Sequence, residues 1–244
     1  MGQGAEIVAI PALSDNYIWL LHDAASGHTA AVDPGDSEAA LRGAAERGWT
    51  IDQLLVTHWH PDHTAGVAQV KAATGAEVWA PEAERAKFDG FDHGLREGDQ
   101  VAIGPWTAQV RDVPGHTLGH IAYVLPEIGA ALVGDTLFAM GCGRLFEGTP
   151  EQMFGSLQRL GELPDETLAY AAHEYTLGNA RFAAHVDGAN AAVAERLRQV
   201  EAARSAGRMT LPTSIAEERA TNPFLRAPDV AEFARLRALK DSFS

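Results

Sequence analysis

Residues 54–66, LLVTHWHPDHTAG, concentrate three histidines and an aspartate within six positions. These side chains, His58, His60, Asp62 and His63, follow an apolar run that predicts a buried strand. Imidazole nitrogen and carboxylate oxygen are ligands that zinc-like and iron-like ions accept. The alternative is a polar loop whose side chains bond to backbone, but the spacing HxHxDH is specific enough to favour a metal site.

Composition limits the kinds of partner. The 244 residues suffice for one large domain or a domain with an appendage, and 46% hydrophobic residues are typical of a globular protein. Nineteen Lys and Arg against 33 Asp and Glu give a net charge of −14, which disfavours nucleic acid and anionic lipid as partners. A small anionic substrate would need a local basic patch.

The single cysteine, Cys142, excludes an intrachain disulfide and a cysteine-based metal site. The first thirteen residues lack the positive start and long apolar run of a signal peptide. No apolar run approaches the roughly 18 residues that span a bilayer. We therefore expect a soluble, cytoplasmic monomer that contacts neither membrane nor nucleic acid.

Short apolar runs alternate with turn signals over the first two-thirds of the chain, which favours a layered α/β core. Strands are expected at 6–13, 16–23, 28–36, 51–58, 76–80, 106–113, 120–126 and 129–135, with helices at 37–48 and about 64–74. Past about His173 the composition favours helices, at 190–207 and 230–240, separated by a Pro-containing loop over 211–228. This tail predicts a small helical domain.

Three further metal-ligand candidates follow predicted strands, where sites on layered sheets are built. They are His116, Asp135 and His173. An isolated aspartate after a strand is more often a turn residue or helix cap. An open catalytic ion usually takes three protein ligands, and the seven candidates together suffice for two ions that share one carboxylate.

The motifs HWHPDH, PGHT, GDTLF and HEY, in this order, resemble the metallo-β-lactamase superfamily and, within it, the glyoxalase II (hydroxyacylglutathione hydrolase) branch. The resemblance runs nearly end to end, through NYIW, GCGRLFEGT and NPFLR to LRALKDSF. It implies a four-layer αβ/βα sandwich over residues 1–173 and a helical substrate-binding domain over 174–244. It also implies a ligand set: His58, His60 and His116 for one ion, Asp62, His63 and His173 for the other, and Asp135 between them. His120 matches no ligand position.

The implied reaction is hydrolysis of S-(2-hydroxyacyl)glutathione, typically S-D-lactoylglutathione, to glutathione and a 2-hydroxy acid, the second step of methylglyoxal detoxification. Two ions lower the pKa of a shared water and supply a bridging hydroxide, with Asp62 and Asp135 as catalytic ligands. A thioester suits such a site because a thiol of pKa about 8.5 leaves without a strong general acid. The expected cofactors are two divalent ions, zinc first, with iron or manganese as alternatives.

The resemblance assigns glutathione contacts to Arg144, Phe146, Tyr175, Arg237 and Lys240. Without it, Arg237 and Lys240 would be assigned to a solvated helix face. Two positions depart from the family, which commonly has Lys in place of Arg144 and Tyr in place of Phe146. Arginine keeps the charge and can bind a carboxylate with two hydrogen bonds, whereas Phe146 loses one hydroxyl.

Three rival functions share part of this pattern. An iron-dependent glutathione persulfide dioxygenase uses the same core motif with a single iron, and oxygen consumption with persulfide would identify it. A nucleic-acid phosphodiesterase is disfavoured by the charge of −14 and the lack of a basic stripe. A metal-binding module without activity is disfavoured because all seven ligand types are present.

Overall fold

The computed structural model describes residues 4–88 and 90–243, which form two compact units. The first unit contains the described chain up to Asp112 and also Leu118–Gly134; the second contains Val113–Thr117 and the chain from Asp135 onward. The first three residues, part of the amino terminus interpreted above, lie outside the described residues.

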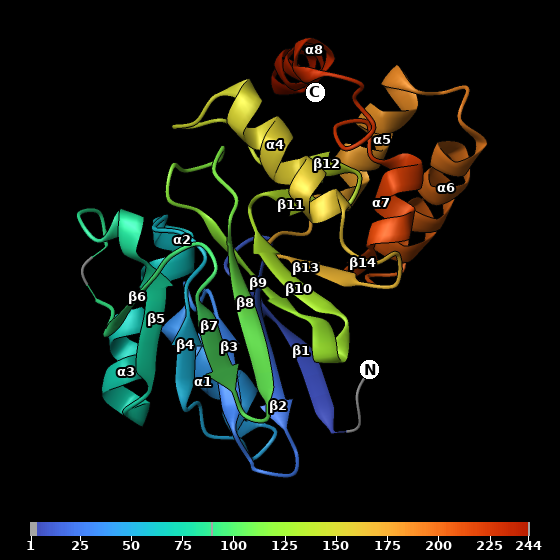
Figure 1. Cartoon of the computed structure of the whole chain (residues 1–244). Helices are drawn as coiled ribbons and strands as arrows, with labels where there is room; N and C mark the ends of the chain where they lie inside the picture. The colour runs from blue at the N-terminus through green and yellow to red at the C-terminus, as the bar shows by residue number, and fades with distance from the viewer. Residues whose placement is uncertain (1–3, 89, 244) are drawn as a thin grey trace. The chain divides into compact units, whose positions relative to one another are not determined.

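The first unit contains a mixed sheet of six strands in the order β1-β2-β3-β4-β5-β6 (Figure 1, blue to green). Its strands are β1 (Ala5–Ala12), β2 (Asn16–Asp23), β3 (Thr29–Val32), β4 (Gln53–Leu55), β5 (Glu77–Pro81) and β6 (His93–Leu95). β1, β2 and β3 pair antiparallel, whereas β3 to β6 pair parallel. Since the carboxyl ends of parallel strands meet at one edge, residues that follow β3 and β4 lie close together.

Three helices lie between the strands of this sheet in chain order: α1 (Ser37–Ala45), α2 (Pro61–Thr64) and α3 (Val67–Thr74). A 3₁₀ turn η1 (Glu82–Glu84) follows β5. Leu20, Leu54 and Val78 of the strands are fully buried in one core with Ala40 of α1 and Val70 of α3. The side chain of Asp36 caps α1 by accepting a hydrogen bond from the Ala39 amide.

Four antiparallel strands of the first unit follow one another in the order β10-β9-β8-β7. They are β7 (Gln100–Ile103), β8 (Trp106–Asp112), β9 (Ile121–Leu125) and β10 (Ala130–Gly134), with a 3₁₀ turn η2 (Pro126–Ile128) between the last two. Every residue of β9 and β10 is buried. Their continuous apolar runs, rather than alternating patterns, fit burial on both faces.

The second unit is mainly helical (Figure 1, yellow to red). Its helices are α4 (Pro150–Gly161), α5 (Thr176–Val186), α6 (Ala191–Ser205), α7 (Ile215–Thr221) and α8 (Val230–Asp241). Four short strands accompany them: the hairpin β11 (Leu137–Phe138) and β12 (Gly141–Cys142), and the antiparallel pair β13 (Leu168–Ala171) and β14 (Thr213–Ser214).

Most predicted elements are confirmed within a few residues, including the α1 and α6 helices and the final helix α8. Two predictions are wrong. The single helix expected at about 64–74 is two helices, α2 and α3, with residues 65 and 66 between them. The loop expected over 211–228 contains α7, which begins at a capping box between Ser214 and Glu217.

Within residues 4–88 and 90–243, no helix is both long enough and apolar enough to cross a bilayer.

Candidate metal centre

The first unit places the histidine-rich stretch just beyond β4. His58 and His63 are fully buried, whereas His60 and Asp62 are partly exposed. His58 Nε2 lies 3.0 Å from His60 Nδ1, and the ring centroids of His58 and His63 are 4.0 Å apart. His63 Nε2 lies 3.3 Å from Asp62 Oδ2. The unit therefore brings together the four donors that the sequence singled out there.

Asp33, the residue after β3, orients two of these histidines. Thr57 donates its amide and its hydroxyl to the Asp33 carboxylate, at 2.7 and 2.8 Å. Because the Thr57 hydroxyl proton points to Asp33, its oxygen accepts from His58 Nδ1 at 3.1 Å, which leaves His58 Nε2 for a ligand. His63 Nδ1 lies 3.1 Å from the same carboxylate, which favours the proton on Nδ1 and frees Nε2 as well.

Asp62 is held by contacts from two other segments of the first unit. Asn16, the buried first residue of β2, donates its side-chain amide to Asp62 Oδ2 at 3.1 Å. The loop after β3 approaches Asp62 so closely that a Cβ at Gly35 would lie 1.7 Å from the Asp62 carbonyl oxygen. Glycine is therefore the residue that fits there.

His120 also belongs to this group. Its ring is fully buried and stacks on that of His58, with centroids 4.6 Å apart and planes 19° apart. It thereby packs against a candidate ligand. Asp33 and Asn16 are functional candidates that the sequence analysis missed; the signals were a DPGD turn directly after a predicted strand and the first residue of NYIW.

The second unit places Asp135 between two histidines. Asp135 Oδ2 lies 3.3 Å from His116 Nε2, and Asp135 Oδ1 lies 3.4 Å from His173 Nε2. All three side chains are buried. Each oxygen of one carboxylate thus faces a different imidazole nitrogen, which is the arrangement expected of a carboxylate shared by two ions.

The backbone of Arg144 fixes the tautomer of His116. His116 Nδ1 lies 2.9 Å from the Arg144 carbonyl oxygen, which can only accept, so Nδ1 carries the proton and Nε2 is available to a metal. The absence of a Cβ at Gly143 allows this close packing, since a Cβ there would lie 3.1 Å from His116 Nδ1 and 2.0 Å from the Asp135 carbonyl oxygen.

His173 packs against aromatic rings of the same unit. The Tyr175 ring stacks on the imidazole with centroids 4.7 Å apart and planes 4° apart. Phe138, in β11, meets both rings edge-on, at 5.9 Å from His173 and 5.3 Å from Tyr175. Phe146 meets His116 edge-on at 5.3 Å, and its side chain is largely exposed.

Two arginines of the second unit contact one carboxylate, and a lysine lies close to both of them. Arg237 Nη2 donates to Asp241 Oδ1 at 2.8 Å, and Arg144 Nε lies 3.7 Å from the same oxygen. Partial burial, followed by repulsion from Arg237 and Arg144, lowers the pKa of Lys240 below its ordinary value. The cluster therefore carries excess positive charge in a chain of net charge −14, as the anionic-substrate hypothesis requires.

Arg237 differs from its simplest sequence interpretation, and Cys142 is buried beside it. Arg237 is not on a solvated helix face: it is buried, and its Nη1 donates to the Cys142 carbonyl oxygen at 3.0 Å. Burial raises the pKa of the Cys142 thiol to about 11. Because a thiolate is the reactive form, this cysteine is unsuited to act as a nucleophile.

The donor sets of both units fit divalent metal. Buried imidazoles offer Nε2 atoms, and their Nδ1 positions are fixed by Thr57, Asp33 or a carbonyl, as in metal sites supported by a second layer of hydrogen bonds. Nitrogen and oxygen donors without cysteine suit zinc, iron or manganese alike.

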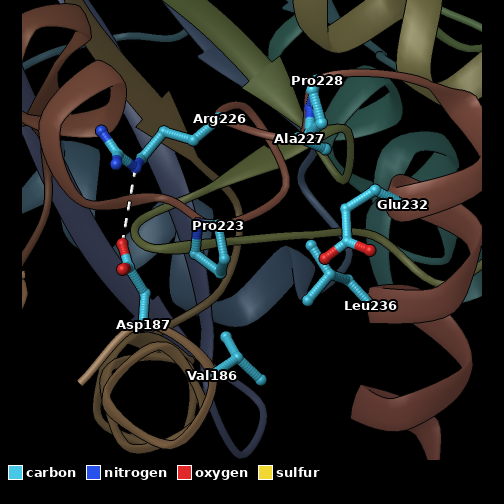
Figure 2. A pocket seen from close by; sticks show the side chains of 8 residues that line it. All are labelled: Val186, Asp187, Pro223, Arg226, Ala227, Pro228, Glu232 and Leu236. Atoms are coloured by element: carbon cyan, nitrogen blue, oxygen red, sulfur yellow. Dashed lines mark ion pairs between the residues drawn. The ribbon is translucent and has the colours of Figure 1, made fainter. Parts of the chain in front are cut away.

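A surface hollow of about 210 Å³ in the second unit contains none of these residues (Figure 2). Its charged members are Asp187 and Arg226, which pair at 3.6 Å, and Glu232, which pairs with Arg235. These groups compensate one another, so the hollow has no feature that indicates a ligand.

Two family models together match nearly the whole chain. Residues 15–173 match the metallo-beta-lactamase superfamily, and residues 174–243 match the hydroxyacylglutathione hydrolase C-terminus. A protein from Erythrobacter litoralis called hydroxyacylglutathione hydrolase is 51% identical, with 98% of this chain and 99% of that protein covered. A protein of the same name from Methylococcus capsulatus is 46% identical, with 98% of each covered.

Solved structures agree on the fold. ETHE1 from Myxococcus xanthus superimposes with a TM-score of 0.72 at 28% identity, over 98% of this chain and 95% of that one. The protein TTHA1623, crystallised in a di-iron-bound form, gives a TM-score of 0.62 at 25% identity, over 90% and 99%.

The chain therefore belongs to the metallo-β-lactamase superfamily, and the expected α/β fold with a helical carboxy-terminal region is confirmed. Within that superfamily it is a member of the hydroxyacylglutathione hydrolase family. Membership implies that a divalent metal binds to the histidines and aspartates of the fold.

Proposed function

We propose that this protein hydrolyses S-(2-hydroxyacyl)glutathione, typically S-D-lactoylglutathione, to glutathione and a 2-hydroxy acid, which is the second step of methylglyoxal detoxification. The observation that carries the proposal is that the second unit contains both a carboxylate flanked by two histidines, Asp135, and a cationic cluster of Arg144, Arg237 and Lys240. Full-length similarity to proteins called hydroxyacylglutathione hydrolase supports the same reaction.

For the metal centre we propose the ligand set that the family resemblance implies. His58, His60 and His116 would hold one ion, Asp62, His63 and His173 the other, and Asp135 would be shared. The hydrogen bonds of His58 and His116 support this set, since each engages Nδ1 and leaves Nε2 for the metal. The crystal structure of TTHA1623 in a di-iron-bound form supports a site for two ions; we favour zinc here, with iron or manganese as alternatives.

The bound metals would activate water and polarise the substrate carbonyl. The protein's own residues would hold the donors rigid and bind the rest of the substrate. No thiol or serine need attack: Cys142 is buried with a raised pKa, and the sequence has no G-x-S-x-G elbow. The glutathione thiol, with a pKa near about 8.5, can depart without a proton donor.

Glutathione carries two carboxylates, and we assign their recognition to the cations of the second unit. Arg144 has an exposed side chain suited to a two-point contact with a carboxylate, and Lys240 adds an ammonium group. Arg237 contributes its charge from a buried position. Tyr175 and Phe146 would flank the peptide part of glutathione. Residues 1–173 would act as the catalytic domain and 174–244 as the substrate-binding domain.

We further propose that the protein works as a cytoplasmic monomer whose partner is a small glutathione thioester, with neither nucleic acid nor membrane. The charge of −14 supports the exclusion of nucleic acid and membrane, because it disfavours polyanions and anionic lipid surfaces.

The deciding experiment is steady-state hydrolysis of S-D-lactoylglutathione by purified, metal-analysed protein, before and after a chelator. We expect rapid turnover that the chelator abolishes and that zinc, iron or manganese restores. A fully metallated protein that fails to cleave the thioester would contradict the proposal. Oxygen consumption with glutathione persulfide, measured on the same preparation, would then identify the dioxygenase alternative.

A further inference from the structure

The hairpin formed by β11 and β12, residues 137–142, connects the metal and substrate residues of the second unit. Asp135 lies two residues before it and Arg144 two residues after it. The two chain segments that flank the hairpin are also joined, because the Gly143 amide donates to the Thr136 carbonyl at 3.2 Å. Any displacement of the hairpin would therefore move both Asp135 and Arg144.

The hairpin also reaches the other two ligands of this unit. His116 donates to the Arg144 carbonyl just past its end. The ring of Phe138, in its first strand, lies against His173. All three second-unit ligands thus depend on where this short hairpin sits.

Two strands of two residues each cannot hold such a position alone, since an isolated hairpin is marginally stable at best. Its turn also contains Met140 at a φ of 56°, a left-handed conformation that is uncommon for a residue with a side chain. Something outside the hairpin must therefore stabilise it.

Buried side chains from the helical tail bind a backbone group on each of five consecutive hairpin residues. Asn222 donates to the carbonyls of Phe138 and Gly141, at 3.2 and 2.9 Å. The other three contacts are Asn179 to the Ala139 carbonyl, the Met140 amide to Glu218, and Arg237 to the Cys142 carbonyl, at 3.1, 2.8 and 3.0 Å. We call Asn179, Glu218, Asn222 and Arg237 the clasp.

The clasp is itself fixed by a buried network. Glu218 and Asn222 are completely buried. The second oxygen of Glu218 accepts from Arg196 at 2.8 Å and from Thr213 at 2.6 Å, so its charge is paired inside the protein. A buried polar network that is fully satisfied specifies one geometry, whereas loss of a member leaves charged or polar groups unsatisfied.

We propose that the clasp is a positioning device for the metal centre: the helical tail sets the hairpin and, through it, the placement of Asp135, His116 and His173. This inference rests on the metal ligands of the proposed function, but not on the identity of the substrate. It gives the tail a second task beside substrate binding, and it makes Arg237 a positioning residue as well as a source of charge.

The test compares Asn222→Ala and Asn179→Ala with Val200→Ala, a control that removes buried apolar volume from α6 in the same unit. Metal-loaded proteins are mixed with excess chelator, and the half-time of metal loss is followed by the absorbance of the chelator complex. We expect Asn222→Ala to lose metal about 10-fold or more faster than the control, the range seen when outer supports of metal ligands are removed. Asn179→Ala, which removes one contact, should show a smaller increase.

Thermal midpoints of all variants separate positioning from general destabilisation. Faster metal loss than in Val200→Ala at a comparable thermal midpoint supports the proposal; equal rates would overturn it. Should Asn222→Ala fail to fold, Asn179→Ala and Glu218→Gln give the same comparison. Slow thioester hydrolysis with clasp-dependent metal loss would contradict the proposed function alone, and normal hydrolysis with unchanged metal loss would contradict this inference alone.

Discussion

The two units hold their candidate metal ligands in opposite ways. In the first, four donors lie within six consecutive residues that follow one strand. In the second, Asp135 follows His116 by 19 positions and His173 follows Asp135 by 38. The first set is held by a neighbouring strand end, through Asp33, whereas the second depends on a hairpin stabilised from a helical tail. A compact motif and a dispersed one thus both gather imidazole and carboxylate donors, with different supports.

The largest effect is expected from removing Asp135, the carboxylate that the ligands of the second unit share. Asp135→Asn keeps the size of the side chain but replaces one oxygen facing a histidine by an amide nitrogen, which does not ligate. We expect metal content to fall below two ions per chain and turnover to fall by at least about 100-fold, the upper end of what losing an outer support costs. Metal analysis and kcat measure this.

Glu166→Gln is the matched control for that variant, because it neutralises an exposed carboxylate of the same unit. It should keep both metal and activity. An Asp135→Asn protein with two ions and normal turnover would contradict the shared-ligand assignment.

The corresponding test of the first set removes its orienting carboxylate. Asp33 has a φ of 52°, which asparagine tolerates, so Asp33→Asn leaves the backbone in place. Its amide nitrogen would face the donors of Thr57 and His63, and both histidine supports would weaken. We expect metal affinity to fall by about 10- to 100-fold.

Competition with a chromophoric chelator would measure that affinity. Asp52→Asn is the control, because Asp52 also accepts a backbone hydrogen bond in the same unit, from Thr29, and contacts none of the donors. An unchanged affinity in Asp33→Asn would mean that the first set needs no support from β3.

The same contrast explains how much of the site could be predicted from sequence. The stretch from His58 to His63 indicates metal by itself, because spacing within one strand-to-helix segment fixes which side chains converge. His116, Asp135 and His173 could be chosen as candidates because each follows a predicted strand. Their assignment to particular ions came only from a family resemblance, since no local rule relates residues so far apart. The hairpin clasp was missed for the same reason: Glu218 and Asn222 lie in a segment predicted to be a loop, and nothing local shows that they reach residues 138–141.

Changes in the cationic cluster of the second unit should have a smaller effect, which is on KM and depends on pH. Lys240→Ala should raise KM for S-D-lactoylglutathione by roughly fivefold with little change in kcat, because a partly exposed ion pair contributes up to about 1 kcal/mol. The lowered pKa of Lys240 means that its ammonium deprotonates at lower pH than that of an ordinary lysine. KM should therefore rise as pH increases into the alkaline range, where the positive charge is lost.

Lys240→Arg is the control for this titration, since a guanidinium stays charged throughout that range and KM should stay level with pH. S-D-lactoyl-N-acetylcysteamine, a thioester without the carboxylates of glutathione, gives an independent check. Its KM should be the same for Lys240→Ala and the unaltered protein. If KM for the glutathione thioester is the same in both variants as in the unaltered protein, Lys240 does not belong to the binding site.

The smallest expected effect concerns Cys142, which lies in the hairpin beside the cationic cluster and is the residue most easily mistaken for a nucleophile. Its thiol is buried, and its pKa of about 11 leaves little thiolate at pH 8. An aromatic disulfide reagent at that pH should react with the native protein far more slowly than with the unfolded chain, and kcat should change by less than about twofold in Cys142→Ala. Rapid modification with parallel loss of activity would show instead that the hairpin opens during turnover. Arg237 donates to the Cys142 carbonyl at 3.0 Å and reaches its sulfur at 3.6 Å. The alanine variant loses only the weaker of these two contacts, so we expect the hairpin to stay closed, with metal loss as slow as in the unaltered protein.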